Sequence, residues 1–269
     1  MSEPGPRFHP ISHGFRWKTR RGPLRRLTPR QRDSFNALGY LHIQAAFAPR
    51  EIATVTAAID PLEAACEQRL HRVGGRLGIA AADVITFTRH LAPRSLALRA
   101  FAAHRFIKDL CHDLLGDEVR LYDDRAVYKK TDKIREFPWH QDIAYGFIEP
   151  QQYLTFWVPL VDVDEESGCL WIAPGLHRQG ALDHWTTDVG LKCLDRVDDA
   201  VPRRARAGDA IVHSSLAPHR SGPNQRKGTV RKAYVLQYCR DGAVALGPDG
   251  QRESVADPVR NFKILGAGA

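Results

Sequence analysis

The sequence changes character near residue 118, and this change limits the folds open to the chain. Before it, apolar residues recur at three- and four-residue spacing, which predicts amphipathic helices over 28–38, 49–70 and 95–115. After it, short β-branched or aromatic runs between turn residues predict strands, at 119–129, 154–163, 169–173, 210–213 and 233–238. Helices first and many short strands afterwards indicate an α+β chain whose second half is an antiparallel barrel or sandwich.

Local signals mark the ends of the helical segments. Thr28 and Pro29 are typical of an N-cap and a first helical turn, and Gly39 is typical of the residue after a helix. Residues 40–43 predict a short strand. Pro61 predicts a kink or a break late in the second helix, because proline cannot donate the backbone hydrogen bond that a helix interior needs.

The 269 residues suit one large domain, expected over 28–269. Residues 1–27 are rich in Pro, Gly and Arg and predict an irregular N-terminal arm. Residues 176–206 are polar and irregular between two predicted strands. An insertion of that length is more typical of a functional lid than of a passive linker.

The net charge of +8 comes from a single segment. Residues 16–32 contain eight arginines and lysines and no acid, and the rest of the chain holds as many basic as acidic residues. A basic arm can contact phosphates or an acidic patch on a partner, but the simpler interpretation is a solvated tail. The neutral body argues against nucleic acid as a partner.

The sequence also indicates a compartment. No apolar run approaches the roughly 18 residues that a membrane span needs, and no signal peptide is expected at the N-terminus. The five scattered cysteines form no CxxC pair, which argues against a disulfide framework or a structural zinc site. These features favour a cytoplasmic protein with no membrane partner.

The segment Pro138-Trp139-His140-Gln141-Asp142 carries the strongest chemical signal. His140 and Asp142 are two residues apart, so on an extended chain both side chains point to the same side and can bind one ion. His219 supplies a candidate third ligand. Two histidines and one carboxylate leave three octahedral positions open, as in non-haem Fe(II) oxygenases, which need them for an organic cosubstrate and oxygen.

Each of these signals is weak by itself, because a lone histidine in a strand is more often a core residue. Arg231 strengthens the pattern: it follows His219 by twelve residues and is placed to bind the far carboxylate of a dianionic cosubstrate. The ordered set lies wholly in the strand-rich half, which is the scaffold that such a site needs.

The same residues belong to a longer pattern that resembles the phytanoyl-CoA dioxygenase (PhyH) family of Fe(II)- and 2-oxoglutarate-dependent oxygenases. The resemblance covers most of residues 33–240. It implies a double-stranded β-helix, a jelly-roll or cupin-like core over 118–240, with flanking helices over 28–117. The matching features are Phe35 with Gly39-Tyr40, His140-Gln141-Asp142, Trp157, Ser167-Gly168-Cys169-Leu170, Pro174-Gly175-Leu176-His177, Gly208-Asp209-Ala210, His219, Ser221-Gly222-Pro223-Asn224 and Arg231-Lys232-Ala233.

The resemblance also implies roles for single residues. Fe(II) would be bound by His140, Asp142 and His219. The distal carboxylate of 2-oxoglutarate would be bound by Arg231 and the hydroxyl of Ser221, beside Trp157. Arg125, or a neighbour on the 120–129 strand, would line the opposite wall. O2 is the second cosubstrate, and ascorbate is expected as a stimulant.

Several nearby residues have more than one interpretation. His213 competes with His219 as the distal ligand, and its place before Ser214 resembles a family position that is not a ligand. Trp139 and Tyr145 are either barrel packing or walls of the substrate site. Lys129 and Lys130 are expected to be solvated near the entrance, and His177 to hold its own turn.

The predicted reaction is hydroxylation of a C–H bond in a small molecule, with release of succinate and CO2. Desaturation, epoxidation and cyclisation are alternatives, and Asp142 argues against halogenation, because related halogenases have a small residue there. Aromatic residues near the ligands and the neutral body favour a mostly apolar or mixed substrate, such as a secondary metabolite, an amino acid or an acyl-CoA. The rivals are an oxygenase acting on nucleic acid or protein, a jelly roll without catalysis, and a cupin-like metalloenzyme without 2-oxoglutarate.

Overall fold

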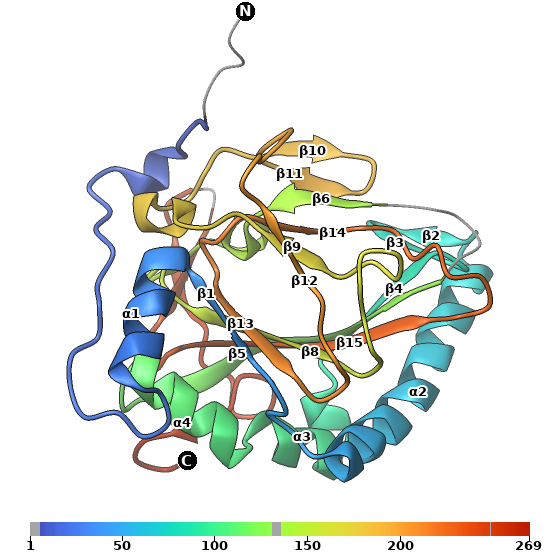
Figure 1. Cartoon of the computed structure of the whole chain (residues 1–269), viewed down its shortest axis with the longest axis horizontal. Coiled ribbons are helices and arrows are strands. Elements are labelled where there is room, and N and C mark those ends of the chain that lie inside the picture. Colours follow the sequence, from blue (N-terminus) through green and yellow to red (C-terminus); the bar gives the residue numbers. More distant parts are fainter. Residues whose placement is uncertain (1–5, 131–135, 248) are drawn as a thin grey trace, which may run out of the picture.

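Two facing antiparallel sheets make up the core of the molecule, which the computed structural model describes over residues 6–130, 136–247 and 249–269 (Figure 1). The large sheet has the order β1 (Tyr40–Ile43), β13 (Ala210–Ser214), β8 (Leu154–Pro159), β15 (Arg231–Arg240), β5 (Val119–Lys129), β4 (Ile85–Arg89), β3 (Ala80–Ala81), β2 (Arg76–Leu77), and β18 (Lys263–Leu265) also pairs with β5. The small sheet has the order β12 (Val201–Arg203), β9 (Leu170–Ile172), β14 (His219–Ser221), β6 (Phe137–His140). This arrangement confirms the predicted α+β fold with a jelly-roll core.

Shorter elements complete the fold. Two small ribbons lie outside the main sheets: β10 (Trp185–Thr187) with β11 (Gly190–Lys192), and β17 (Arg252–Ser254) with β16 (Val244–Leu246) and β7 (Ile148–Glu149). The α-helices are α1 (Pro29–Leu38), α2 (Pro49–Arg72), α3 (Leu96–Ala102) and α4 (Arg105–Leu114), and the 3-10 turns are η1 (Pro10–Ser12), η2 (Ala92–Arg94), η3 (Asp142–Tyr145) and η4 (Leu176–Gln179). Within the described part of the chain, no helix is both long and apolar enough to span a membrane.

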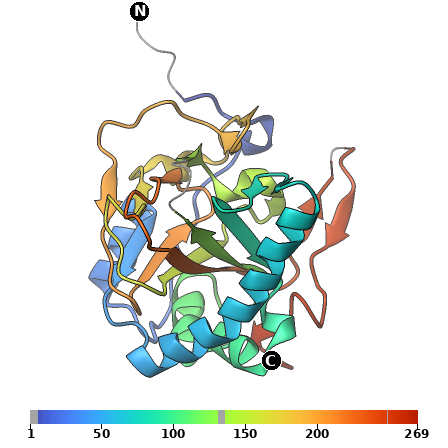
Figure 2. The ribbon, with the colours of Figure 1, turned by 90° about the vertical axis from the view of Figure 1, so that its right-hand side faces the viewer.

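Alternation along β15 shows how the large sheet separates two environments. Tyr234, Leu236 and Tyr238 pack in one apolar cluster with residues of α2, α3 and α4. Ala233 and Val235 point to the other face, into the space between the sheets. Successive side chains of a strand point to opposite faces, so one strand serves both the helical layer and the interior. Figure 2 shows α2 passing diagonally over the strands.

The helix predictions were partly correct. Helix α1 begins and ends as predicted: the Thr28 side chain accepts a hydrogen bond from the backbone N–H of Gln31, and Gly39 is left-handed with φ 85°. Of the kink or break predicted at Pro61, the break is wrong, because α2 continues through Pro61 to Arg72. The predicted single helix over 95–115 is also wrong: it divides into α3 and α4, where the His104 side chain caps a new helix by accepting from the backbone N–H of Phe106.

All five strands predicted after residue 118, and the strand at 40–43, are present as β5, β8, β9, β13, β15 and β1. The sequence prediction missed β4, β6 and β14. Two of these, β6 and β14, carry the histidines of the predicted metal site, and β4 forms one wall of the same cavity.

The N-terminal arm is not a solvated tail over residues 6–27, which corrects that prediction; residues 1–5 lie outside the described residues. The Asp113 carboxylate accepts hydrogen bonds from three consecutive backbone N–H groups, those of residues 25–27. Arg20 donates to the carbonyl of His112 and pairs with Asp117. These contacts tie the arm to the body of the protein, and one of them, Arg20 with Asp117, is an ion pair.

The insertion over 176–206 contains real secondary structure and covers the segment that carries the metal ligands. The backbone N–H of Cys193 donates to the carbonyl of Trp139, and the fully buried side chain of Gln141 bonds to Gly180 and Leu182. The description of this insertion as a lid stays a prediction.

Candidate metal site and its cavity

His140, Asp142 and His219 come together at the end of the small sheet. His140 ends β6, His219 begins β14, and the two are paired across the antiparallel ladder with ring centroids 4.2 Å apart. Gln141 is extended, so Asp142 stays on the same side as His140 although it begins η3. One ligand atom from each of the three residues lies within 4.8 Å of the others, and all three side chains are buried. The fold therefore assembles the predicted ligand set.

Backbone carbonyls orient both imidazole rings. Nδ1 of His140 lies 2.8 Å from the carbonyl oxygen of Pro138, and Nδ1 of His219 lies 3.0 Å from that of Ala217. A proton on Nδ1 leaves the lone pair on Nε2 free for a metal. Burial, and the neighbouring charge of His219, lower the pKa of His140 well below its ordinary value, which keeps this ring neutral.

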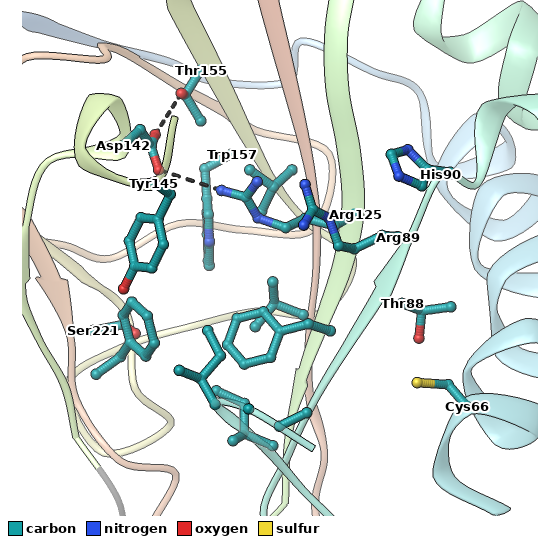
Figure 3. Close-up of a pocket in the computed structure, with 18 of the residues that line it drawn as sticks. Cys66, Thr88, Arg89, His90, Arg125, Asp142, Tyr145, Thr155, Trp157 and Ser221 are labelled. Atoms are coloured by element: carbon teal, nitrogen blue, oxygen red, sulfur yellow. Dashed lines mark hydrogen bonds and ion pairs between the residues drawn. The ribbon is translucent and has the colours of Figure 1, made fainter. Parts of the chain in front are cut away.

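Asp142 is held by two donors, drawn in Figure 3. Its Oδ2 accepts a hydrogen bond of 2.6 Å from the hydroxyl of Thr155, and its Oδ1 accepts one of 3.3 Å from Nη2 of Arg125. Burial alone raises the pKa of Asp142, but the neighbouring histidines and Arg125 outweigh it and hold the pKa below its ordinary value. The carboxylate is therefore ionised, as a divalent cation requires.

His213 is a neighbour of this set and not a member of it. Its ring packs 4.4 Å from that of His219, but its nitrogens do not join the three mutually close ligand atoms. Its Nδ1 lies 3.1 Å from the carbonyl oxygen of Ser214, and burial lowers the pKa of His213 to about 3. The geometry favours His219 as the distal ligand.

Arg231 is a buried cation with few partners. It is 2% exposed, its Nη1 donates to the carbonyl of Val127 at 3.1 Å, and its Nε has no hydrogen-bond partner in the described chain. The guanidinium also lies over the ring of Trp157, 5.6 Å from its centroid. A buried charge is costly unless an opposite charge meets it, so this side chain is suited to an anionic ligand.

Lys129 is the largest correction at this site. It was expected to be solvated, but it is 2% exposed. Its Nζ donates to the hydroxyl of Ser221 at 2.9 Å and to the carbonyls of Ser221 and Gly222 at 3.0 and 2.7 Å. Since the Ser221 oxygen accepts from Lys129, its own proton is free to be donated into the cavity. Lys130, the other predicted solvated lysine, is half-buried and pairs with Glu67 at 3.0 Å.

The motifs that carry the family resemblance also contact one another. A side chain at Gly168 would come within 2.5 Å of the carbonyl oxygen of Gly222, so the Ser-Gly-Cys segment packs against the segment that follows His219. Likewise, a side chain at Gly39 would come within 2.5 Å of the ring of His177. These close approaches explain why glycine stands at both positions.

The metal ligands open into a cavity of about 640 Å³. Arg231, Ser221 and Trp157 line it together with Arg125, so all the predicted site residues face one space. A second cavity of about 220 Å³ adjoins it, and Asp142, Arg125 and Tyr145 line both.

The aromatic residues near the metal ligands fall into two groups, those that line the cavity and those that pack elsewhere. Tyr145 and Trp157 line the cavity, whereas Trp139 packs in a small apolar cluster with Ala173, Leu182 and Cys193. Phe147 stacks on His9. Tyr145 is therefore a wall of the site, and Trp139 is packing.

Comparisons with known proteins agree with this geometry. The family model described as "Phytanoyl-CoA dioxygenase (PhyH)" matches residues 35–233. The chain belongs to the PhyH family. Among curated relatives, the chain is 32% identical over 180 residues to a methylphosphonate hydroxylase of Gimesia maris, covering 65% of each chain. It is 27% identical over 140 residues to a probable alpha-ketoglutarate-dependent hypophosphite dioxygenase of Stutzerimonas stutzeri, covering 48% of each. The matches thus span about half to two thirds of these relatives' lengths.

A solved structure supports the fold. The epimerase SnoN, in complex with Fe3+, alpha ketoglutarate and nogalamycin RO, aligns with a TM-score of 0.67 over 87% of this chain and 97% of that one, at 22% identity. The predicted PhyH family and its jelly-roll fold are therefore confirmed.

The family pattern assigned no role to two residues of the site. Arg89, at the end of β4, lies directly opposite Arg125 in the ladder between β4 and β5. Gln141, between two PhyH ligands, donates to the carbonyls of Gly180 and Leu216 and so joins the metal loop to its neighbours. The alternation of Ile85, Phe87 and Arg89 was a strand signal that could have placed Arg89 on the cavity face.

Proposed function

We propose that this PhyH chain is an Fe(II)- and 2-oxoglutarate-dependent dioxygenase that oxidises a C–H bond of a small molecule, with release of succinate and CO2. One observation carries the proposal: three mutually close metal ligands share a cavity with a buried arginine whose Nε lacks a partner in the described residues. A metal site alone would not need such a cation.

The residues present fit both groups. The two histidines, each held at Nδ1 by a backbone carbonyl, and the ionised carboxylate suit Fe(II), and three ligands leave positions open for a chelating cosubstrate. Arg231, with the free proton of the Ser221 hydroxyl, suits the distal carboxylate of 2-oxoglutarate. When bound, iron and 2-oxoglutarate supply the oxidising power that activates O2 and breaks a substrate C–H bond.

The protein's own residues have distinct tasks in this scheme. His140, Asp142 and His219 hold the metal, and Thr155 and Arg125 fix the rotamer of Asp142. Trp157 forms an apolar wall beside the cosubstrate and packs on the guanidinium that binds it. Lys129 fixes Ser221 so that its hydroxyl donates in one direction. Burial of these groups excludes water from the reacting atoms.

Hydroxylation is the outcome favoured by the ligand set. A carboxylate at 142 fills the position that chloride would need for halogenation. Desaturation, epoxidation and cyclisation use the same oxidising chemistry, and the position of the substrate relative to the metal determines which of these outcomes occurs. The 640 Å³ volume suits a small molecule together with the cosubstrate.

The names of the relatives suggest a chemical class for that molecule. The methylphosphonate hydroxylase and the probable hypophosphite dioxygenase are both named for phosphorus oxyanions. An anionic substrate would differ from the mostly apolar one that the neutral composition favoured.

The proposal is tested by following succinate formed from 2-oxoglutarate. The purified chain should form succinate slowly without substrate, only when Fe(II) and O2 are both supplied, and faster with a true substrate. Asp142→Ala should abolish this signal, and the surface variant Asp33→Ala should keep it. Succinate formation that persists in the Asp142→Ala variant would contradict the proposal.

A further inference from the structure

Charge in the two cavities is far from balanced, although the body of the protein is neutral. Among the described residues that line them, two are acidic, Asp123 and Asp142, and six are arginines: Arg69, Arg89, Arg94, Arg125, Arg231 and Arg260. Once Asp142 binds a metal, its charge is no longer available to these arginines. The cavities then favour an anion beyond the cosubstrate.

Two of the arginines form a pair at the junction of the cavities. Arg89 and Arg125 are register partners on adjacent strands, and each reaches a different oxygen of Asp123, at 3.3 and 2.6 Å. Like charges directly opposite one another in a sheet are destabilising, and Asp123 alone compensates only half of this pair. The other carboxylate within reach, Asp142, contacts Arg125 at 3.3 Å and is one of the metal ligands. Figure 3 shows Arg125 between Asp142 and Arg89.

Within this pair, Arg89 is the arginine whose N–H donors are mostly without a partner among the described residues. Its guanidinium makes one ionic contact, to Asp123, and no hydrogen bond to any described residue. The Arg89 side chain is 59% exposed and lines both cavities. Arg125, in contrast, already donates to Asp123, Gln237 and Asp142.

Tyrosine hydroxyls add neutral donors on the wall of the smaller cavity. Tyr153 is 1% exposed, and Tyr122 packs edge-on against it with ring centroids 5.2 Å apart. Neither hydroxyl has a hydrogen-bond partner in the parts of the chain that the structure describes. Burial raises the pKa of Tyr122 to about 12, so this hydroxyl stays protonated and can donate. Tyr122 is half-buried and Tyr153 is buried, and both line the cavity, so their hydroxyls can donate to a ligand bound there.

We propose that Arg89 and Arg125, with the hydroxyls of Tyr122 and Tyr153, bind an oxyanion group of the substrate, a phosphonate or a carboxylate. This anion site is separate from the Arg231 site and rests on the proposed function for its place beside the metal. Because Arg125 touches both Asp142 and the anion, the oxidised carbon lies within a few bonds of the anionic group.

The test is calorimetric titration of the full chain, loaded anaerobically with Fe(II) and 2-oxoglutarate, so that binding is measured without turnover. The probes are propylphosphonate, butyrate and butyramide, the last being a neutral match for butyrate. At least one of the two anions should bind, and butyramide should not. The affinities of propylphosphonate and butyrate then show which anionic group the site prefers. Binding of butyramide as tightly as the anions would overturn the proposal.

Variants separate this site from the cosubstrate site. Arg89→Gln should weaken binding of the preferred anion about tenfold or more, since a hydrogen bond to a charged group contributes on that scale. Tyr153→Phe should weaken it less, and Arg50→Gln, an exposed arginine outside both cavities, should not change it. All three should bind 2-oxoglutarate like the wild type.

The titration of 2-oxoglutarate comes first and keeps the two proposals distinguishable. If the wild type does not bind 2-oxoglutarate, the proposed function fails. If it binds 2-oxoglutarate but neither anion, or if Arg89→Gln binds the anion as tightly as wild type, only the anion site fails. Loss of 2-oxoglutarate binding in Arg89→Gln would also overturn it, because Arg89 would then serve the cosubstrate.

Discussion

Two walls of one cavity are built in opposite ways. On the wall formed by β6, β14 and the paired ends of β5 and β15, the functional groups are buried: Arg231 is 2% exposed and Lys129 is fully hydrogen-bonded. On the wall at the end of β4, Arg89 is 59% exposed and makes a single ionic contact. Metal and cosubstrate chemistry needs preorganised groups, whereas substrate choice needs donors that are still free.

This difference indicates which wall can change at the lower structural cost. The buried wall is fixed by contacts between residues far apart in the chain, such as Lys129 with Ser221, so a change there disturbs several partners. The β4 wall lies near the edge of the large sheet, with only the two-residue strands β3 and β2 beyond it, and the exposed end of β4 can change its side chains without disturbing the core. Function can diverge at the second wall while the first is kept.

The largest effect is expected on the buried wall, from Asp142→Ala. Losing this ligand should weaken Fe(II) binding by more than the roughly 10–100-fold that an outer partner of a metal ligand costs. Asp33→Ala, an exposed carboxylate on α1, is the control. Metal titration by calorimetry measures the change, and unchanged Fe(II) affinity would remove Asp142 from the ligand set.

Arg231→Met should raise the Kd for 2-oxoglutarate by about 10–100-fold, because hydrogen bonds to charged groups contribute about 1.5–3 kcal/mol. Fe(II) binding should be unchanged, since Arg231 does not reach the metal. Thermal unfolding of the ligand-free variant should show no loss of stability, because the substitution removes a buried charge that lacks a full set of partners. Equal loss of iron affinity would contradict the role assigned to Arg231.

Lys129→Met should raise the same Kd by roughly tenfold, through misplacement of the Ser221 hydroxyl. Lys130→Met is the matched control, since the ammonium of Lys130 pairs with Glu67 and not with Ser221. The double variant Lys129→Met with Ser221→Ala should be little worse than either single variant, because the two act as a unit. Fully additive losses would show that Lys129 acts independently of Ser221.

The smallest effect lies outside both walls and concerns stability alone. Burial lowers the pKa of His177 to about 4, below the roughly 6.5 of an unfolded histidine. Between these values the unfolded chain binds more protons, so stability falls as the pH falls from about 6.5 to 4. Between pH 7 and pH 5, the free energy of unfolding should fall by about 1–2 kcal/mol less in His177→Gln than in the wild type, as measured by urea unfolding. An unchanged pH slope would show that folding does not lower the pKa of His177.

Sequence predicted the buried wall far better than the β4 wall, and the reason is physical. His140, Asp142, His219 and Arg231 are constrained by what a metal and a dicarboxylate need, so their types and spacing are visible in the chain. The burial of Lys129 depends on carbonyls about ninety residues away, and no local pattern encodes it. Arg89 lies on β4, in the half of the chain where the sequence pattern predicted helices, so this strand was not predicted.

The fold shows the same division. Helix α1 and strand β5 were predicted with their ends, because caps, glycine and alternation are local signals. The continuity of α2 through Pro61 was not, because the buried face formed by Ile52, Val55 and Ile59 packs on the sheet and keeps the helix together. Tertiary packing overrode a local breaker there.

The assignment of an iron and 2-oxoglutarate site is tested most directly by an anaerobic titration of the purified chain with Fe(II) and then 2-oxoglutarate, followed by visible absorption. A weak charge-transfer band should appear only when both are present, and it should be lost in Asp142→Ala. In Arg231→Met the band should require much more 2-oxoglutarate. Iron that binds without giving this band at any 2-oxoglutarate concentration would contradict the central claim and favour a cupin-like metalloenzyme.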